Sequence, residues 1–395
     1  MSKHYDVIVI GAGLVGLATG YHLLLKNPDC KIAILEKEAG VAVHQSGNNS
    51  GVIHSGIYYR PGSLKAKNCI DGYHALIDFA QEYGVEYEIC GKIIVATSEK
   101  EVVLLDEIYR KGNANGLSDL KYLSREEFRE IEPHCEGVKA IHVPQTGIID
   151  YKGMAEKLKE LIITMGGEIL FHRRVEKIKK DTPIMVQTST EEFFTRKLIT
   201  CAGLYSDKIG KLTSNQNDLL IVPFRGEYYQ LKENRKHLVN HLIYPVPNPD
   251  FPFLGVHFTR MINGEIEAGP NAVLAFKREG YRFSDFSLRD AMETVRWPGF
   301  RKIVGRYGKT GIGEVQRSLS KTAFTRALKK LIPEITEHDL MPGGAGVRAQ
   351  ALTRDGILVD DFDILSDGTI VHVRNAPSPA ATSCLAIGQS LSQLV

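Results

Sequence analysis

A glycine-rich turn near the start of the chain constrains the fold more than any other feature. Residues 6–10 form a short apolar run rich in β-branched side chains, which predicts a buried parallel strand. The motif Gly11-Ala12-Gly13-Leu14-Val15-Gly16 follows, and a helix-compatible run continues to about residue 25. A second apolar run, residues 31–35, ends at Glu36. Strand, glycine turn, helix, strand and acid in this order indicate a dinucleotide-binding unit.

Each glycine of the motif has a physical task. Gly11 permits the tight turn, Gly13 lets the backbone approach a pyrophosphate, and Gly16 allows the helix to pack closely on the strand. The helix N-terminus presents its free N–H groups to the phosphate charge. Glu36 is placed to accept hydrogen bonds from a ribose, and its charge would repel a 2′-phosphate.

A targeting segment and a glycine turn without a nucleotide are weaker interpretations of this region. Residues 7–25 contain no Asp, Glu, Lys or Arg, as in a signal peptide or a membrane span. However, only Lys3 supplies positive charge before this run, and glycines interrupt it. A glycine turn without a nucleotide would not need the second strand and the acid that follow.

The composition of the whole chain agrees with a globular protein. Its 395 residues suggest two domains or one large interrupted domain, and 43% hydrophobic residues suffice for a substantial core. A formal charge of +2 gives no reason to expect a nucleic-acid partner. The six cysteines contain no CxxC pair, so we expect reduced thiols in a cytoplasm, with neither a disulfide framework nor a metal site.

The order of segments predicts a dinucleotide-binding domain interrupted twice by a second domain. We assign residues 1–84, 147–218 and 341–395 to the first domain, and residues 85–146 and 219–340 to the second. Hydrophobic spacing and capping signals predict helices at residues 61–83, 99–113, 122–131 and 151–165. Predicted strands lie at residues 87–89, 92–96, 168–171, 175–179, 192–197, 222–229, 254–258, 356–359 and 369–373.

Residues 287–331 are predicted to be helical, with breaks at residues 297–299 and 308–313. The last helix of this region is basic and amphipathic. Such a helix can lie on a membrane surface, although packing on its own sheet is the favoured interpretation.

Four further stretches supply candidate site residues. Residues 39–59 are poor in charge and dense in Gly, Ser, Asn and His, which suits a loop that wraps a cofactor. Residues 197–203 predict a buried strand that ends in small residues and could pass beside the glycine turn; an ordinary core strand is equally compatible. Residues 341–350 bring Arg348 out of a flexible glycine stretch. Residues 375–383 open a final helix whose free N–H groups suit partial negative charge.

The layout of the chain resembles that of D-amino-acid-oxidase-type flavoproteins. Within that superfamily the chain is similar to L-2-hydroxyglutarate oxidases (dehydrogenases) along essentially its whole length. Residues 49–59, 223–229, 257–260, 343–350 and 378–388 carry the similarity, and the first of these stretches is specific. The resemblance implies an α/β fold, with a Rossmann-like FAD-binding domain interrupted by an α+β substrate domain that has a mostly antiparallel sheet.

The resemblance also implies noncovalent FAD and the oxidation of L-2-hydroxyglutarate to 2-oxoglutarate, with a hydride passing to flavin N5. A base must remove the hydroxyl proton, and an imidazole suits that task. His54 is the preferred base and His257 the reserve. Two carboxylates need cationic or donor-rich anchors, and Arg binds a carboxylate bidentately. The candidate anchors are Arg348, Arg260 and Arg225, and the candidate orienting groups are His257 and Tyr59.

A larger set of residues is expected to bind the cofactor. These are Gly11, Gly13, Leu14, Val15, Gly16, Glu36, Lys37, His44, Gln45, Ser46, Asn49, Ser50, Gly51, Val175, Cys201, Ala202, Gly203, Ser378, Ala381, Thr382 and Ser383.

Two other functions stay open. A flavin-dependent amine or amino-acid oxidase would share every nucleotide feature and differ only in its substrate contacts. A non-catalytic flavin-bound redox sensor would instead use its basic helix to engage a partner. The electron acceptor is equally open among oxygen, a quinone and an electron-transfer protein, and so is a contact with the inner face of the membrane.

Overall fold

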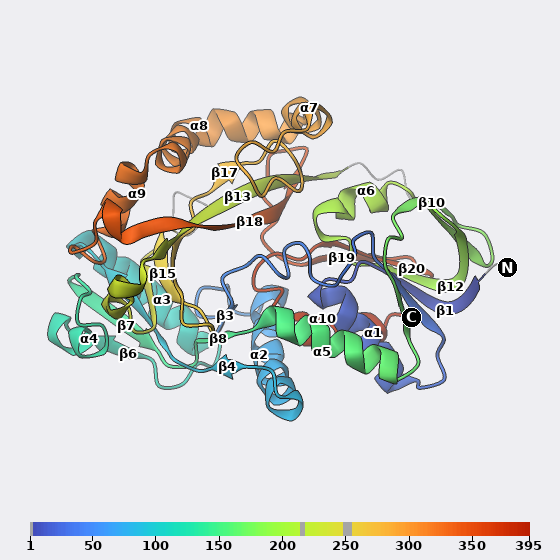
Figure 1. Ribbon diagram of the computed structural model, residues 1–395, viewed down its shortest axis with the longest axis horizontal. Coiled ribbons are helices and arrows are strands. Elements are labelled where there is room, and N and C mark those ends of the chain that lie inside the picture. Colours follow the sequence, from blue (N-terminus) through green and yellow to red (C-terminus); the bar gives the residue numbers. More distant parts are fainter. Residues whose placement is uncertain (1–2, 214–217, 248–254) are drawn as a thin grey trace.

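Two large β-sheets organise the molecule, one in each of two lobes that lie side by side in Figure 1. The computed structural model describes residues 3–213, 218–247 and 255–395, without the side chains of residues 307–310, 312–317 and 319. A small sheet of β3 (Val52–Ile53), β8 (Gly147–Ile149) and β4 (Tyr87–Glu88) lies near the junction of the lobes.

The first sheet contains the predicted N-terminal strand, which pairs in parallel with two neighbours. Its strands are β1 (Lys3–Ile10), β2 (Ile32–Leu35), β9 (Glu168–Leu170), β10 (Val175–Lys179), β11 (Ile184–Thr188), β12 (Glu192–Thr200), β19 (Asp363–Ser366) and β20 (Ile370–Asn375). Val7 and Val9 belong to one core cluster, whereas Ile8 and Ile10 belong to another. Successive side chains of a strand point to opposite faces, so β1 is buried on both sides.

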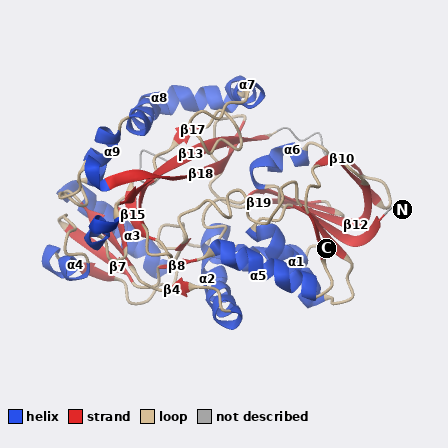
Figure 2. Ribbon diagram, viewed as in Figure 1, coloured by secondary structure: helices blue, strands red, loops and turns tan. Residues whose placement is uncertain are grey.

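Four helices, among those drawn blue in Figure 2, contribute side chains to the core cluster that contains Val7 and Val9. These are α1 (Leu14–Lys26), α2 (Leu64–Tyr83), α5 (Tyr151–Thr164) and α10 (Cys384–Ser392). The last helix packs against the first so closely that a Cβ on Gly388 would lie 2.5 Å from the carbonyl carbon of Ala18. The C-terminal helix is therefore part of the same layer as the helix of the glycine motif.

The second sheet is mostly antiparallel, as predicted: all of its strand pairs are antiparallel except β14 with β5. Its strands are β5 (Lys92–Ala96), β6 (Lys121–Leu123), β7 (Lys139–Val143), β13 (Leu219–Leu231), β14 (Leu242–Pro245), β15 (His257–Arg260), β16 (Ile266–Gly269), β17 (Val273–Leu274) and β18 (Leu340–Thr353).

The glycine stretch before Arg348 is a long strand, not the flexible segment that its composition suggested. β18 pairs along most of its length with β13. A Cβ on Gly343 would lie 2.8 Å from the carbonyl oxygen of Tyr228, and one on Gly346 would lie 2.8 Å from that of Asn48. These glycines allow close approach of neighbouring backbones. The chain thus stays in the second sheet beyond residue 341 and returns to the first sheet with β19 and β20.

Three helices line the outer side of the second lobe in Figure 1: α7 (Leu288–Arg296), α8 (Pro298–Leu319) and α9 (Lys321–Leu328). The predicted break at residues 308–313 is wrong, because α8 runs through these glycines and ends before Ser320, which caps α9. Phe324 and Leu328 of α9 are buried in the core of the second sheet, so this basic helix packs on its own sheet as favoured.

The other elements largely follow the predictions. The remaining helices are α3 (Glu99–Ala114), α4 (Arg125–Ile131) and α6 (Ser206–Gly210), and Ser124 and Glu127 form the predicted capping box of α4. Residues 356–359 form only an isolated bridge, between Leu352 and Leu358. The predicted strand at 254–258 starts at His257, and Leu254 lies outside the described residues. The helix predicted at residues 122–131 begins only at Arg125, because residues 121–123 pair with β7 as β6. The short strands β3, β6, β7, β8, β11, β14, β16, β17 and β19 were not predicted. Across the described ranges, every helix is too short or too polar to cross a membrane.

Candidate functional site

The glycine turn brings three backbone segments into contact. Gly11 has a φ of +104°, and a Cβ on it would lie 2.4 Å from the carbonyl oxygen of Cys201. A Cβ on Gly16 would lie 1.9 Å from the carbonyl oxygen of Gly11. No side chain fits at either position. The strand that ends at residues 201–203 therefore passes beside the turn, as predicted.

Glu36 closes the turn from the end of β2. Its buried carboxylate accepts hydrogen bonds from the backbone N–H groups of Ala12 (2.7 Å) and Glu38 (3.0 Å). At the start of α1, Leu14 N–H donates to Ser46 Oγ at 3.0 Å, so the loop after Glu36 folds back over the helix N-terminus. Acid, turn and loop thus form one unit.

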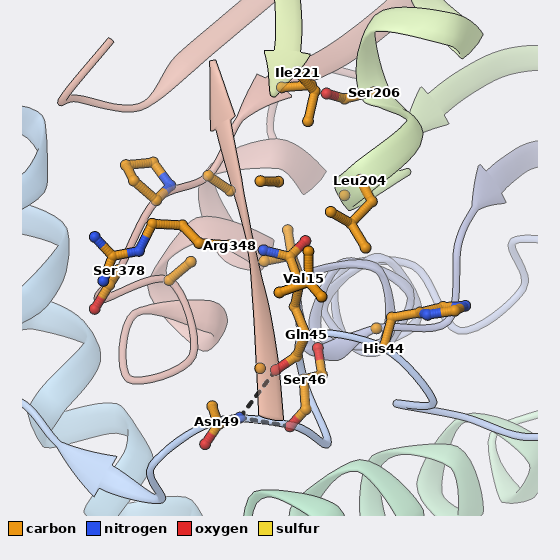
Figure 3. A pocket seen from close by; sticks show the side chains of 18 of the residues that line it. Val15, His44, Gln45, Ser46, Asn49, Leu204, Ser206, Ile221, Arg348 and Ser378 are labelled. Carbon is orange, nitrogen blue, oxygen red and sulfur yellow. Dashed lines mark hydrogen bonds between the residues drawn. The ribbon is translucent and has the colours of Figure 1, made fainter. Parts of the chain in front are cut away.

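A cavity of about 980 Å³ starts at this turn and is lined by residues of both large sheets. Figure 3 shows its extent: His44 lies at one end, Val15 and Gln45 lie between, and Arg348 and Ser378 lie at the other end. Asn49 Nδ2 donates to the carbonyl oxygens of Gln45 and Ser46, which holds the loop in shape along the cavity.

The end of the cavity marked by Arg348 gathers histidine, tyrosine and arginine side chains. The polar residues that line it include His54, Tyr58, Tyr59, Tyr244, His257 and Arg348. Arg348 comes from β18 and extends in the direction of Ser378 in Figure 3. His257 comes from β15, and its Nδ1 lies 2.9 Å from the carbonyl oxygen of Gly255. A carbonyl oxygen only accepts, so Nδ1 carries the hydrogen in the neutral ring and Nε2 keeps its lone pair.

Burial keeps both histidines neutral. It lowers the pKa of His54 to about 3, and the neighbouring Lys92, His257, Lys65 and Arg348 act in the same direction. Burial also lowers the pKa of His257 to about 4, with Lys92 and Arg348 adding to the effect and the contact with Gly255 opposing it. Each imidazole is therefore unprotonated at neutral pH, the form whose lone pair is available to a substrate hydroxyl.

Most of the predicted cofactor residues line this cavity. The exceptions are Gly51, Thr382 and Ser383. The Thr382 hydroxyl instead bonds the Tyr151 hydroxyl (2.9 Å) and accepts from the backbone N–H of His54 (3.1 Å). The final helix begins at Cys384, later than predicted, and residues 376–381 line the cavity as a turn-rich segment before it.

Arg260 and Arg225, the other two candidate anchors, have different surroundings. Arg260 does not line the cavity, because its Nη2 lies 2.5 Å from Glu88 Oε1 in an ion pair; the structure does not bring it to the other candidates. Arg225 is buried and lines the cavity, but its Nε lies 3.0 Å from Glu227 Oε1. Of the three candidate anchors, Arg348 is therefore the one best placed beside His54 and His257.

Sequence reasoning missed three residues at this end. Tyr58 and Tyr244 line the cavity, and the Lys92 ammonium, which is not among the lining groups, lies 4.7 Å and 4.9 Å from the centres of their rings. The only sequence signal was a lysine at the start of an otherwise apolar predicted strand.

At the opposite end, Glu38, His44 and Glu279 place oxygen and nitrogen atoms within 4.8 Å of one another, as metal ligands do. The Lys37 ammonium lies among them, 2.9 Å from His44 Nε2 and paired with both carboxylates. One of the two negative charges of this cluster is thus already balanced by a cation.

The residues present fit FAD. The turn has no room for side chains, the N-terminus of α1 faces the cavity, and Glu36 lies at the end of β2. This arrangement accommodates a pyrophosphate and an adenosine ribose. The cavity then continues beyond the turn to the histidines and Arg348, which leaves space for a ring system next to a substrate.

Comparison with known proteins agrees with this geometry. Residues 6–394 match the family model of the DAO FAD-dependent oxidoreductases. The chain is 55% identical over 391 residues to the L-2-hydroxyglutarate dehydrogenase of Indibacter alkaliphilus, covering 98% of each chain. It is 45% identical to the human mitochondrial L-2-hydroxyglutarate dehydrogenase, covering 100% of this chain and 89% of that one.

Solved structures show the same fold at low sequence identity. The L-α-glycerophosphate oxidase of Mycoplasma pneumoniae with FAD bound superposes with a TM-score of 0.81 at 24% identity, covering 99% of this chain and 94% of that one. Glycine oxidase from Geobacillus kaustophilus gives 0.74 at 15% identity, covering 100% and 95%. The predicted D-amino-acid-oxidase-type fold is thus confirmed, and the chain belongs to the DAO family of FAD-dependent oxidoreductases.

Proposed function

We propose that the protein oxidises L-2-hydroxyglutarate to 2-oxoglutarate. The observation that carries the proposal is that one cavity is lined both by the glycine turn with Glu36 and by two neutral histidines with Arg348. The relatives named as L-2-hydroxyglutarate dehydrogenases support the choice of substrate. When bound, FAD supplies the acceptor for the two electrons that leave substrate C2 as a hydride.

The side chains of this chain divide the remaining tasks. His54 takes the hydroxyl proton of the substrate, with His257 Nε2 as the second candidate base. Arg348 binds the carboxylate next to the reacting carbon, because a guanidinium fits a carboxylate with two parallel hydrogen bonds. Tyr59 orients the substrate from the same wall, and Arg225 is the candidate for the distal carboxylate.

An amine or amino-acid oxidase is the second candidate, because glycine oxidase shares the fold. Anaerobic mixing of the purified holoenzyme with a panel of 2-hydroxy acids and amino acids separates the two. We expect L-2-hydroxyglutarate to bleach the flavin absorbance fastest. Faster bleaching by glycine or another amino acid would reverse the assignment.

We propose that the FAD is noncovalent and that Glu36 contacts its adenosine ribose. Acid precipitation should release yellow flavin into the supernatant with adenylate recoverable from it. Flavin that stays on the pellet contradicts noncovalent binding, and recovery of FMN or NAD instead contradicts the ribose contact.

We also propose a cytoplasmic protein that contacts an anionic membrane surface, from which a lipid-soluble acceptor such as a quinone would be reached. The support is an exposed apolar face outside the core: Leu288, Met292 and Val295 lie on one side of α7, and Phe283 and Phe286 precede them. Leu288 is 66% exposed and Phe283 64%. Residues 276–330 contain fourteen Lys and Arg against five Asp and Glu, which suits anionic lipid headgroups.

Flotation with lipid vesicles tests this contact. We expect the protein to float with vesicles that contain phosphatidylglycerol, to stay behind with neutral vesicles, and to be released by high salt. The double variant Phe286→Ser/Leu288→Ser should lose flotation. Ile163→Ser, which changes another exposed apolar side chain, on α5, is the control. Equal flotation of all three proteins would reject α7 as the contact.

A further inference from the structure

Lys92 is a cation buried inside the second lobe without a carboxylate partner. Its side chain is 2% exposed. It starts β5, whose other four residues are buried and apolar. Within residues 3–213, 218–247 and 255–395, its ammonium contacts aromatic rings and forms neither an ion pair nor a hydrogen bond. A buried charge without a counter-ion costs several kcal/mol, so its retention needs a reason other than stability.

The rings that hold Lys92 belong to the wall of the cavity. Tyr58 and Tyr244 both line the cavity, and the ammonium lies within 5 Å of each ring centre. The Tyr244 ring packs against His257 in a tilted arrangement, with 3.9 Å between ring centres and 31° between planes. Lys92, Tyr244 and His257 thus form a continuous contact from the buried cation to a candidate base.

We propose that Lys92 is a positioning residue of the substrate pocket, which acts through the Tyr58 and Tyr244 rings to orient His257 and to give the pocket a positive potential. The proposal rests on the proposed function, because a dianionic substrate is what such a potential would favour. Lys92 is not among the residues that line the cavity, so it acts on a bound substrate through the two rings that are.

The charged and titratable groups around Lys92 make the effect specific. Tyr58, Tyr244, His54, His257 and the Cys69 thiol face it from other elements. In the part of the chain that the structure describes, no carboxylate is among the groups that interact with it electrostatically. The positive charge therefore acts on the two histidines, where it opposes their protonation, and on any anion that enters the cavity.

Substrate binding and Lys92 protonation should then be linked. Burial lowers the pKa of Lys92 to about 7, so near neutral pH only part of the population carries the charge. A bound dianion favours the charged form, and by reciprocity the charged form favours the dianion. Binding of a dicarboxylate should consequently draw protons from the buffer between about pH 7 and 9.

The decisive variant is Lys92→Met, which keeps the length of the side chain and removes the charge. Binding is measured with glutarate, which has both carboxylates but no hydroxyl to oxidise, by the perturbation of the flavin spectrum and by calorimetry in buffers of different ionisation enthalpy. We expect Lys92→Met to weaken glutarate binding by about tenfold or more, and to abolish the proton uptake. The acid limb of anaerobic flavin reduction should also move to higher pH by about one unit, because the histidines lose a cation that opposed their protonation.

Lys139→Met is the matched control. Lys139 lies in the same sheet, on β7, with its ammonium 4.1 Å from the centre of the Tyr122 ring, but it pairs with the opposite end of β5 and does not line the cavity. This variant should bind glutarate like the wild type. Flavin content and thermal unfolding of both variants are measured first, and Lys92→Met should be at least as stable as the wild type, because it removes an uncompensated buried charge.

Several results would overturn the proposal. Wild-type glutarate affinity in Lys92→Met does so, and so does an equal loss in Lys139→Met. If Lys92→Met does not fold, the wild type still decides, because glutarate binding without proton uptake between pH 7 and 9 contradicts the linkage. Failure of the proposed function looks different: the wild type would then bind glutarate with proton uptake but would not be reduced by L-2-hydroxyglutarate.

Discussion

The sequence alone does not distinguish Arg348 from Arg260, but their surroundings in the structure differ. Both were candidate anchors for a substrate carboxylate, yet Arg348 lines the cavity whereas Arg260 is paired with Glu88. We expect Arg348→Lys to lose about 1.5–3 kcal/mol of transition-state binding on L-2-hydroxyglutarate, because Lys keeps the charge but not the bidentate fork.

The matched variant Arg260→Lys should stay close to wild-type kinetics. The measurement is the anaerobic rate of flavin reduction as a function of substrate concentration, at equal flavin content. An unaffected Arg348→Lys, or an equal loss in Arg260→Lys, would remove Arg348 from the role of carboxylate anchor.

The base is the second question at the scale of residues. We expect His54→Ala to slow anaerobic flavin reduction by about 10²–10⁴-fold, the range of general base catalysis. A rate near that of the wild type would transfer the role to His257. The low pKa values of both histidines leave them unprotonated at neutral pH, so the wild-type rate should not fall on the acid side until well below pH 6.5.

Residues whose role depends on local sequence were predictable, and those whose role depends on distant contacts were not. Gly11, Gly16 and Glu36 act within one strand–turn–helix unit, so their spacing revealed their positions. Lys92 is connected to the cavity only because β14 brings Tyr244 beside β5. The ion pair that keeps Arg260 from the cavity likewise joins segments 172 residues apart.

At the scale of elements, α1 is specified by its local sequence and β18 by contacts with a distant segment. Helix α1 follows from apolar spacing and the glycine turn, whereas the glycine stretch of β18 has little strand propensity and is a strand because β13 supplies its backbone partners. Short strands such as β16 and β17 are specified by pairing rather than by their own sequences, so no pattern marked them.

The packing of α10 on α1 gives a test at this scale. A Cβ on Gly388 would lie 2.5–2.8 Å from backbone atoms of Ala18 and Thr19, which cannot move away as a flexible side chain can. We expect Gly388→Ala to destabilise the protein by about 1–3 kcal/mol, the usual cost of overpacking. Its flavin content should fall as well, because α1 carries the glycine turn.

Gly305→Ala in α8 is the control for the intrinsic helix preference of Ala. Its Cβ would meet nothing within 4 Å, so this variant should be neutral or more stable by up to about 1 kcal/mol. Thermal and denaturant unfolding measure both variants. A Gly388→Ala protein as stable as Gly305→Ala would mean that the two helices do not pack as closely as described.

At the scale of the whole molecule, the two lobes enclose polar groups that each lobe alone would expose to water. The cavity takes residues from both large sheets, and His54, His257 and Lys92 all have their charged forms disfavoured by burial there. Part of the stability of the fold should therefore depend on pH through the site itself.

The sign of this dependence follows from the histidines. Their pKa is lowered in the folded protein, so the unfolded chain binds more protons between pH 6.5 and about 4. The stability that depends on neutral histidines is complete above pH 6.5 and is lost as the pH falls below this value. We expect the melting temperature of the holoenzyme to fall between pH 7 and pH 5, a window above the range in which low-pKa carboxylates such as Glu38 and Asp367 become protonated.

The double variant His54→Ala/His257→Ala should show a smaller fall over this window than the wild type. Burial raises the pKa of Glu267 to about 7, and this one carboxyl acts in the opposite direction over the same window, because the folded protein binds the extra proton. Burial also lowers the pKa of His22, His142 and His372, so a residual slope of the same sign should remain. The control is His74→Ala, which removes an exposed histidine of α2 and should keep the wild-type slope. Differential scanning calorimetry at pH 5, 6 and 7 measures all three proteins. An unchanged slope in the double variant would mean that the fold does not hold His54 and His257 neutral. Neither histidine would then be shown to be in the unprotonated form that a base needs.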